Sequence, residues 1–311
     1  MTTYSDEWIV SRRGPRNPVD PKRTYHFLIE EERSASSEVV RGVTIFLTNR
    51  ECPWRCLMCD LWKNTLTRSV APGDIPKQIE FALERLGGNA RQVKLYNSGS
   101  FFDAAAIPPS DYPAIAKLLS GFERVIVECH PALVGERVLE FQRLLTGNLE
   151  VAIGLETVHP EVLPRLNKRM TVGMFAGAAH FLKKHEIDLR AFVLLKPPFV
   201  SEDEGVHWAQ RSVEFAFDCG AGVVSIIPVR PGNGALEALE FEPPRLESLE
   251  TALANGIRLQ RGRVFADLWD LRQFSQCAAC FETRSERLTR MNLSQVLEPP
   301  IHCAQCQPTS T

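Results

Sequence analysis

The sequence has no apolar run long enough to cross a bilayer, because no stretch reaches the roughly 18 apolar residues that a spanning helix needs. It also has little excess charge, since 36 basic and 38 acidic residues give a formal net charge of -2. Bulk charge therefore predicts no attraction to nucleic acid or to a membrane, although a local basic face would escape this count. The opening stretch MTTYSDEWIVSRRGPR lacks the apolar core of a secretory signal. We expect no membrane association and a cytoplasmic location.

Internal repeats and long low-complexity runs are absent as well. The 311 residues suffice for one large domain with a small appendage, or for two ordinary domains. Hydrophobic residues make up 44% and charged residues 24%, as in an average soluble globular protein. This composition excludes a disordered, collagen-like or coiled-coil chain.

Short apolar runs rich in β-formers alternate with amphipathic stretches from about residue 43 to 230. Each run is nearly continuous in Val, Ile, Leu or Phe, which is typical of strands covered on both faces. The six runs are Val43–Leu47, Gln92–Tyr96, Arg124–Glu128, Val151–Leu155, Leu189–Leu195 and Val223–Ile227. The alternation predicts parallel βαβ units of an α/β fold, as an open doubly wound sheet or a partial (β/α) barrel. Either architecture places an active site at the carboxyl ends of the strands.

Three segments follow from this pattern. Residues 1–40 are polar, and we interpret them as an irregular lead-in. Residues 41–235 form the predicted barrel unit, in which Ser201 and Glu204 should make a capping box at the start of a helix. Residues 236–311 are interpreted as a C-terminal extension that is helical near 240–262, has a candidate last strand at Val264–Trp269 and is irregular from 275.

Nine cysteines are the unusual feature of the composition. Their number is odd, and seven of them fall in two tight clusters, which in a reducing compartment indicates metal ligands rather than disulfides. Cys129 and Cys219 stand apart and are interpreted as core residues.

The first cluster is C-x3-C-x2-C, formed by Cys52, Cys56 and Cys59 directly after the first predicted strand. No fourth cysteine or histidine is near, whereas a structural zinc site usually closes with four ligands. Three thiolates on a cubic iron–sulfur cluster would leave one iron open to a substrate or cofactor. The alternatives are a zinc site completed from a distance, or three free cysteines.

The second cluster is a pair of C-x2-C motifs, Cys277 with Cys280 and Cys303 with Cys306. Paired motifs of this kind can donate four thiolates to one tetrahedral zinc ion. A second iron–sulfur cluster and four uncoordinated thiols are the alternatives.

The C-x3-C-x2-C motif, placed after the first strand of a six-stranded β/α pattern, resembles the radical S-adenosylmethionine (radical SAM) superfamily. The resemblance implies a partial (β/α)6 TIM-type barrel with a small Cys-rich C-terminal extension. It implies a [4Fe-4S] cluster on the three cysteines, with S-adenosylmethionine (SAM) on the fourth iron. Reductive cleavage of SAM would then give a 5′-deoxyadenosyl radical that abstracts hydrogen from a substrate. An electron donor such as a ferredoxin or a flavodoxin is implied as well.

The resemblance also assigns SAM contacts to residues near the strand ends. The expected contacts are Met58, Ser98, Gly99, Ser100, Glu128, Glu156 and Lys196. Glu128 could instead pair with a nearby arginine, and Lys196 could be a surface lysine. His130 is interpreted as structural, while Arg230 and the loop at 167–169 are weaker candidates for contacts with an anion.

Six motifs between 43 and 205 are similar to the radical SAM component of archaeosine synthase and its bacterial relatives, and more distantly to the Elongator catalytic subunit. They are IFLTNRECPWRCLMC, LYNSGSFFD, VECHPALV, IGLETVHPEVL, LNKRMT and LLKPPFVSEDE. This similarity implies C–N bond cleavage on a 7-deazaguanine of tRNA. The alternatives are a radical SAM enzyme that acts on a small molecule or a protein, and a non-catalytic zinc-binding scaffold.

Overall fold

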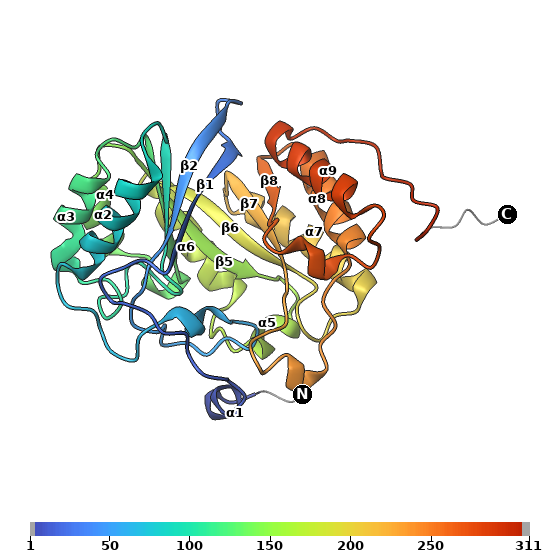
Figure 1. Ribbon diagram of the computed structural model, residues 1–311, viewed down its shortest axis with the longest axis horizontal. Helices are drawn as coiled ribbons and strands as arrows, with labels where there is room; N and C mark the ends of the chain where they lie inside the picture. The colour runs from blue at the N-terminus through green and yellow to red at the C-terminus, as the bar shows by residue number, and fades with distance from the viewer. Residues whose placement is uncertain (1–3, 307–311) are drawn as a thin grey trace.

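The computed structural model describes residues 4–306, which are built around one eight-stranded sheet (Figure 1). The strands are β1 His26–Arg33, β2 Val39–Phe46, β3 Gln92–Tyr96, β4 Arg124–Cys129, β5 Asn148–Glu156, β6 Asp188–Leu195, β7 Val223–Pro228 and β8 Arg263–Ala266. They lie in the sheet in sequence order. β1 pairs with β2 in the antiparallel direction, and all later neighbours are parallel. The sheet curls into a partial barrel.

Helices cover the outer face of this sheet. They are α2 Asp74–Leu86, α3 Tyr112–Leu118, α4 Glu136–Gln142, α6 Val172–Lys184, α7 Glu202–Asp218, α8 Leu246–Arg258 and α9 Phe281–Ser294. The short helices α1 Asp6–Ser11 and α5 Val162–Arg165 lie instead at the carboxyl end of the barrel (Figure 1). Figure 1 shows α2, α3 and α4 on one side of the barrel and α7, α8 and α9 on the other. The apolar core lies between helices and strands, where alternate strand residues such as Val43, Ile45 and Val93 are fully buried. No helix in the described part is both long and apolar enough to cross a membrane.

The predicted partial α/β barrel is confirmed, and the six predicted strands are β2 to β7. The candidate last strand at Val264–Trp269 is present as β8, and the sheet is larger than expected because β1 extends its other edge. β1 lies in the stretch interpreted as irregular, since the second half of its sequence HFLIEEER is charged and only three apolar residues stand together in it. Its Glu30 and Glu32 face the barrel interior, where both pair with Lys94. A strand whose inward face is charged does not show the hydrophobic pattern used to find strands.

The amino-terminal half of the barrel interior is filled by this ion network. Arg190 binds Glu32 at 2.6 Å and Glu150 at 2.6 Å, and each of the three side chains is less than a tenth exposed. Although burial alone would raise the pKa of Glu32, Arg190 and Lys94 hold that pKa well below its usual range. The carboxyl-terminal half is left for other side chains.

The C-terminal part is more regular than expected, because α9 occupies much of the stretch interpreted as irregular. Two amide side chains, one in the last turn of α9 and one directly after it, bind the outer edge of β8. Asn292 Nδ2 donates to Ala266 O at 2.8 Å and its Oδ1 accepts from Ala266 N at 2.9 Å. Gln295 makes the same pair of bonds with Val264, at 2.8 and 2.9 Å. These amides take the place of a further strand. The capping box of Ser201 and Glu204 at the start of α7 is confirmed.

Candidate functional site

The three cysteines of the first cluster lie on the loop that follows β2, at the carboxyl end of the barrel strands. All three side chains are half-buried and none forms a disulfide. Later loops hold the backbone of this loop in place. Leu57 N donates to Leu166 O at 2.9 Å, and Asn233 Nδ2 donates to Leu57 O at 2.7 Å. The loop is therefore fixed from both the β5 and the β7 sides of the barrel.

A stacked pair of rings fixes the same loop against β4. Trp54, between the first two cysteines, stacks on His130 with ring centroids 3.6 Å apart and planes at 14°. His130 Nδ1 accepts from Ala132 N at 3.2 Å, so its Nε2 carries the proton and donates to Lys168 O at 3.1 Å. Burial lowers the pKa of His130 to about 4, so the ring is neutral. His130 thus acts as a support, in agreement with its structural interpretation.

The N-terminal arm reaches the cysteine loop through Glu51. Arg13 binds this carboxylate at 2.6 Å, Arg16 also pairs with it, and Arg55 lies 3.3 Å away. Burial alone would raise the pKa of Glu51, but hydrogen bonds from Arg16 and Arg13 lower it. Residues that the sequence placed in an irregular lead-in therefore clamp the loop, and the spacing of the cysteines gave no sign of this.

The turn after β3 packs directly against the first cysteine. A Cβ atom placed on Gly99 would lie 3.2 Å from Cys52 Cβ, so even alanine at this position would be in tight contact with the cysteine. Ser98 adopts the left-handed conformation with φ of 55°, which is uncommon outside glycine. Ser100 is buried, and its hydroxyl lies 3.5 Å from Cys129 Sγ. The structure thus brings Ser98, Gly99 and Ser100 beside the cysteine loop.

Several buried polar atoms around this turn have no hydrogen-bond partner. They are Asn97 Nδ2 and Oδ1, Ser98 Oγ, Thr48 Oγ1 and Asn49 Oδ1. Buried polar atoms are normally paired, so an orphaned set indicates a place for a polar ligand. All of them follow β2 or β3 at the same mouth of the barrel.

Glu128, at the end of β4, faces the same turn. Its Oε2 accepts a hydrogen bond from Asn97 N at 3.0 Å, and it meets no arginine among the described residues. Burial raises its pKa to about 7, although the amides of the turn act in the opposite direction. A carboxyl group with this pKa changes its protonation state near neutral pH.

A buried ion pair between Glu156 and Lys168 lies at the end of β5. A register irregularity between Gly154 and Glu156 turns the strand end, and Glu156 has φ of 65°. Lys168 Nζ binds the Glu156 carboxylate and donates to Gly154 O at 2.7 Å. Burial alone would lower the pKa of Lys168, but Glu156, Cys56 and Cys52 raise it. The sequence gave Lys168 only as a weak anion contact, yet its charge acts to lower the pKa of both Cys52 and Cys56.

The other predicted residues are placed as follows. The side chain of Met58 packs on an apolar cluster that includes Leu194 and Val229. The Lys196 ammonium binds Glu202 at 3.2 Å and donates to Glu242 O at 2.8 Å, so it is occupied by α7 and the chain before α8. Contacts of Met58, Ser98, Gly99, Ser100, Glu128, Glu156 and Lys196 with a cofactor stay predictions.

The weaker candidates for anion contacts are all engaged within the chain. Arg230 binds Asp267 at 2.7 Å. Asn167 donates to Arg55 O at 2.8 Å, and Arg169 binds Asp6 at 2.6 Å.

A row of six aromatic rings crosses the interior of the barrel. Tyr25 lies 5.8 Å and His26 5.6 Å from Phe46, centroid to centroid, and His26 is also 5.5 Å from Trp269. Tyr96 continues the row at 6.1 Å from Phe46 and 6.0 Å from Phe192. These rings are half-buried or exposed, and Trp269 is 56% exposed. They come from the residue before β1, from β1, β2, β3 and β6, and from the chain after β8, so no local pattern in the sequence links them.

The four cysteines of the second cluster meet at the start of α9. Their sulfur atoms all lie within 4.8 Å of one another, with Cys277 Sγ 3.9 Å from Cys303 Sγ and Cys280 Sγ 3.7 Å from Cys306 Sγ. A tetrahedral ion with Zn–S bonds of about 2.3 Å sets its sulfurs about 3.8 Å apart. The spacing therefore fits one ion, and a cluster of several irons would need more room.

Arg284 joins this sulfur group to the helices. It donates to Cys280 Sγ at 3.2 Å and binds Glu250 of α8. A positive charge beside a thiolate stabilises the ligand form of the cysteine.

The first cluster has a different geometry. Within residues 4–306, Cys52, Cys56 and Cys59 do not form a group as close as the second one and have no fourth ligand within that range. Burial raises the pKa of Cys52 to about 11 and of Cys59 to about 12, so these thiols are neutral until a metal displaces their protons. Three thiols on one loop, a close glycine turn and orphaned polar atoms fit a [4Fe-4S] cluster with a polar cofactor on its open corner.

Comparison with known proteins gives related sequences, although no family model matches the chain. Archaeosine synthase subunit beta of Methanosarcina acetivorans is 29% identical over 234 residues, which cover 68% of this chain and 67% of that protein. The same subunit of Thermococcus kodakarensis is 33% identical over 147 residues, 45% of each chain. An uncharacterised protein of Methanocaldococcus jannaschii is 26% identical over 253 residues, 75% of this chain and 69% of the other.

Solved structures show the same fold at low sequence identity. Methylornithine synthase matches with a TM-score of 0.53 and 12% identity, covering 85% of this chain and 75% of its own. The Methanocaldococcus infernus Elp3 matches with a TM-score of 0.51 and 16% identity, covering 75% of this chain and 61% of its own. These likenesses show the fold of this chain, a partial TIM-type barrel of the radical SAM kind.

Proposed function

The chain is an enzyme with the radical SAM fold and a sequence relative of archaeosine synthase subunit beta, and from this premise we propose that it cleaves SAM reductively at a [4Fe-4S] cluster. The radical so formed would abstract hydrogen from a modified base of tRNA, leading to C–N bond cleavage as in archaeosine synthase. The electron donor, a ferredoxin or a flavodoxin, is part of the proposal, as is a cytoplasmic location.

One observation carries this proposal. The three-cysteine loop and the turn after β3 touch each other at the carboxyl mouth of the barrel, where Gly99 leaves no gap to Cys52. Cys52, Cys56 and Cys59 would hold the cluster, which when bound supplies one electron to the SAM sulfonium. Beside them, the orphaned atoms of Asn97 and Ser98 offer partners for the polar groups of SAM.

The remaining residues of the mouth position and shield these groups. His130 holds Trp54 over the cysteine loop, which keeps water from one side of it. Lys168 places a positive charge near Cys52 and Cys56, which favours their thiolate forms. The left-handed conformations of Ser98 and Glu156 are the kind of backbone strain that gathers at functional sites.

The aromatic row supports a flat substrate. Stacking of a nucleobase on an aromatic ring contributes about 1–3 kcal/mol per base, and every base has a face that can stack. Trp269 and His26 at the exposed end of the row are available for such contacts. Enzymes that act on a base within folded nucleic acid bring it out of its stack into a pocket. A tRNA base fits this lining better than an aliphatic small molecule or a peptide does.

The second cysteine group is proposed to bind structural zinc. The sulfur spacing of 3.7 and 3.9 Å supports a single tetrahedral ion over a second iron–sulfur cluster. The site is closed by four thiolates, so it has no open position for catalysis.

A direct test is anaerobic reconstitution with iron and sulfide, followed by incubation with SAM and dithionite. We expect a brown protein that forms 5′-deoxyadenosine, and a Cys56→Ala variant that does neither. Cys219→Ala is the matched control, because Cys219 belongs to neither cluster and should leave both properties unchanged. A reconstituted protein that binds only zinc would show instead a non-catalytic scaffold.

The substrate is tested separately. Modified nucleosides in total tRNA are compared between cells with and without the gene, by liquid chromatography and mass spectrometry. We expect one nucleoside to lose its modification and its precursor to accumulate. An unchanged profile together with active SAM cleavage would move the substrate to a small molecule or a protein.

A further inference from the structure

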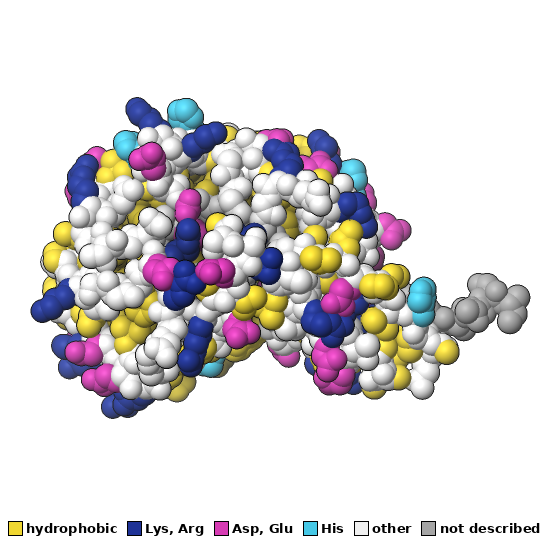
Figure 2. Space-filling view, turned by 90° about the horizontal axis from the view of Figure 1, so that it is seen from above, with side chains coloured by type: hydrophobic (Ala, Val, Ile, Leu, Met, Phe, Trp, Pro, Cys, Tyr) yellow, Lys and Arg dark blue, Asp and Glu magenta, His cyan; other side chains and the backbone are white. Residues whose placement is uncertain are grey.

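We propose that the amino-terminal mouth of the barrel binds an oxyanion of the phosphate type, either free phosphate or the phosphate group of a nucleotide. This mouth is at the opposite end of the strands from the cysteine loop, and the proposal does not depend on the chemistry there. Figure 2 looks onto this end of the molecule, where basic and acidic side chains gather in the central part.

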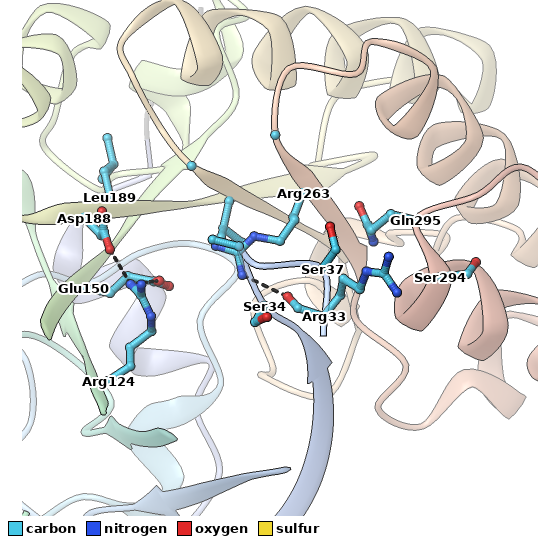
Figure 3. A pocket seen from close by; sticks show the side chains of 14 residues that line it. Arg33, Ser34, Ser37, Arg124, Glu150, Asp188, Leu189, Arg263, Ser294 and Gln295 are labelled. Carbon is cyan, nitrogen blue, oxygen red and sulfur yellow. Dashed lines mark hydrogen bonds and ion pairs between the residues drawn. The ribbon is translucent and has the colours of Figure 1, made fainter. Parts of the chain in front are cut away.

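The site is a cavity of about 490 Å³ between the first residues of β4 to β8 and the hairpin of β1 and β2. Its polar lining includes Arg33, Arg124, Arg263, Glu150, Asp188 and Gln295 (Figure 3). Ligand cavities are commonly about 300–1,000 Å³ and mostly apolar. This one has a suitable size but a charged wall, so it suits a small polar ion or a mononucleotide.

One of the three arginines is already neutralised. Arg124 binds Glu150 at 3.0 Å and also pairs with Asp188. The other oxygen of Glu150 is taken by Arg190 at 2.6 Å. Figure 3 shows Arg124, Glu150 and Asp188 together on one side of the cavity, while Arg33 and Arg263 lie on the other side.

Arg33 and Arg263 have no carboxylate partner among residues 4–306. Arg263 donates one hydrogen bond to Arg33 O at 2.9 Å, which leaves most of its five N–H donors free. Both side chains are half-buried, so water screens their charges less than on an open surface. Burial also lowers the pKa of Arg263, in line with a cation that lacks a counter-ion.

A count of charges gives the sign of the missing partner. The connected ion network has as cations Lys94, Arg124 and Arg190, and as carboxylates Glu30, Glu32, Glu150 and Asp188. Three cations and four carboxylates give this network a net charge of -1. Adding the two unpaired arginines, Arg33 and Arg263, gives the whole group a net charge of +1. A bound anion would balance the group.

The geometry of the free donors favours a tetrahedral oxyanion over chloride. The guanidinium group is planar and presents paired N–H donors that match phosphate oxygens, so two arginines on neighbouring elements can grip one such group. β1 and β8 are the two edges of the sheet, and the anion would join them.

The test is calorimetric titration of the full chain with inorganic phosphate and with UMP, at constant ionic strength set by chloride, with uridine as the ligand that lacks a phosphate. We expect saturable binding of phosphate or UMP and none of uridine. Tighter binding of UMP than of phosphate would identify a nucleotide, and equal binding would identify free phosphate.

Arg263→Gln and Arg33→Gln should each weaken this binding at least tenfold. Arg261→Gln is the matched control, because Arg261 is exposed, pairs with Asp218 at 2.8 Å and should leave the affinity unchanged. Circular dichroism confirms that each variant is folded, and the two test positions lie on different strands. The proposal would be overturned if neither phosphate nor UMP bound at concentrations that saturate a phosphate-binding control protein. An equal loss of affinity in Arg261→Gln would overturn it as well.

Discussion

The contribution of Glu128 to the stability of this protein should fall as pH rises from about 4.5 to 7. The pKa of this carboxyl group is raised by burial from the ordinary 4.5 to about 7. The folded chain therefore binds a proton more tightly than the unfolded chain between these pH values. Since stability falls with pH wherever the folded state holds more protons, the group lowers the free energy of unfolding progressively up to pH 7.

The size of this effect follows from the shift. Each pKa unit corresponds to about 1.4 kcal/mol, so a shift of this size costs about 3 kcal/mol once the carboxylate is fully charged. Glu128→Gln removes the titration but keeps an oxygen that can accept the hydrogen bond from Asn97 N, now at 3.0 Å. Relative to the native chain, the variant should gain about 3 kcal/mol of stability between pH 4.5 and pH 8.

Urea denaturation followed by tryptophan fluorescence measures this difference under anaerobic conditions. The comparison with the variant is essential because His130, whose pKa is lowered to about 4, makes stability rise with pH between about 4 and 6.5. That contribution is common to both chains and cancels. Glu140→Gln on α4, an exposed position without an ion pair among the described residues, is the matched control for replacing a glutamate by glutamine. A stability difference for Glu128→Gln that does not change with pH would refute the reasoning.

Three further changes test other parts of the structure. Cys280→Ser should remove the C-terminal metal and lower the melting temperature, yet leave the iron in the first cluster. Metal analysis and calorimetry measure these effects, and loss of both metals would indicate one shared centre. Gly154→Ala would place a Cβ atom against the Glu156 carboxylate and the Lys168 ammonium and should cost about 1–3 kcal/mol, while Gly173→Ala on α6, with 3.6 Å of room, should cost little. His130→Ala should free Trp54 and reduce the iron retained on desalting, whereas unchanged iron content and fluorescence would show that the stacked pair is dispensable.

The fold could be predicted from the sequence where apolar periodicity determines it. The runs at Val151–Leu155 and Val223–Ile227 are strands because both of their faces are covered, and the helices between them have a clear apolar side. β1 was not predicted as a strand, because the side chains that it turns inward include the carboxylates of Glu30 and Glu32. α9 was not predicted as a helix for a related reason. The residues that it buries include Arg284 and Arg287, which bind Glu250 and do not form an apolar pattern in the sequence.

The candidate site shows the same limit. Cysteine spacing indicated both metal-binding groups, because ligands close in sequence must be close in space. The Lys168–Glu156 pair, the clamp on Glu51 and the aromatic row depend on contacts between distant elements. No local pattern encodes such contacts, and only the curl of the sheet brings them together.

The covering of β8 by α9 links metal supply to self-association. The helix begins directly after Cys280, and at its far end two side-chain amides occupy hydrogen-bonding groups that would otherwise face outward. If the ion at the start of α9 is lost and the helix detaches, the last strand presents an open row of donors and acceptors to other molecules. Bare strand edges recruit further chains and seed aggregates. Protein prepared without a metal at this site should therefore aggregate before the barrel unfolds.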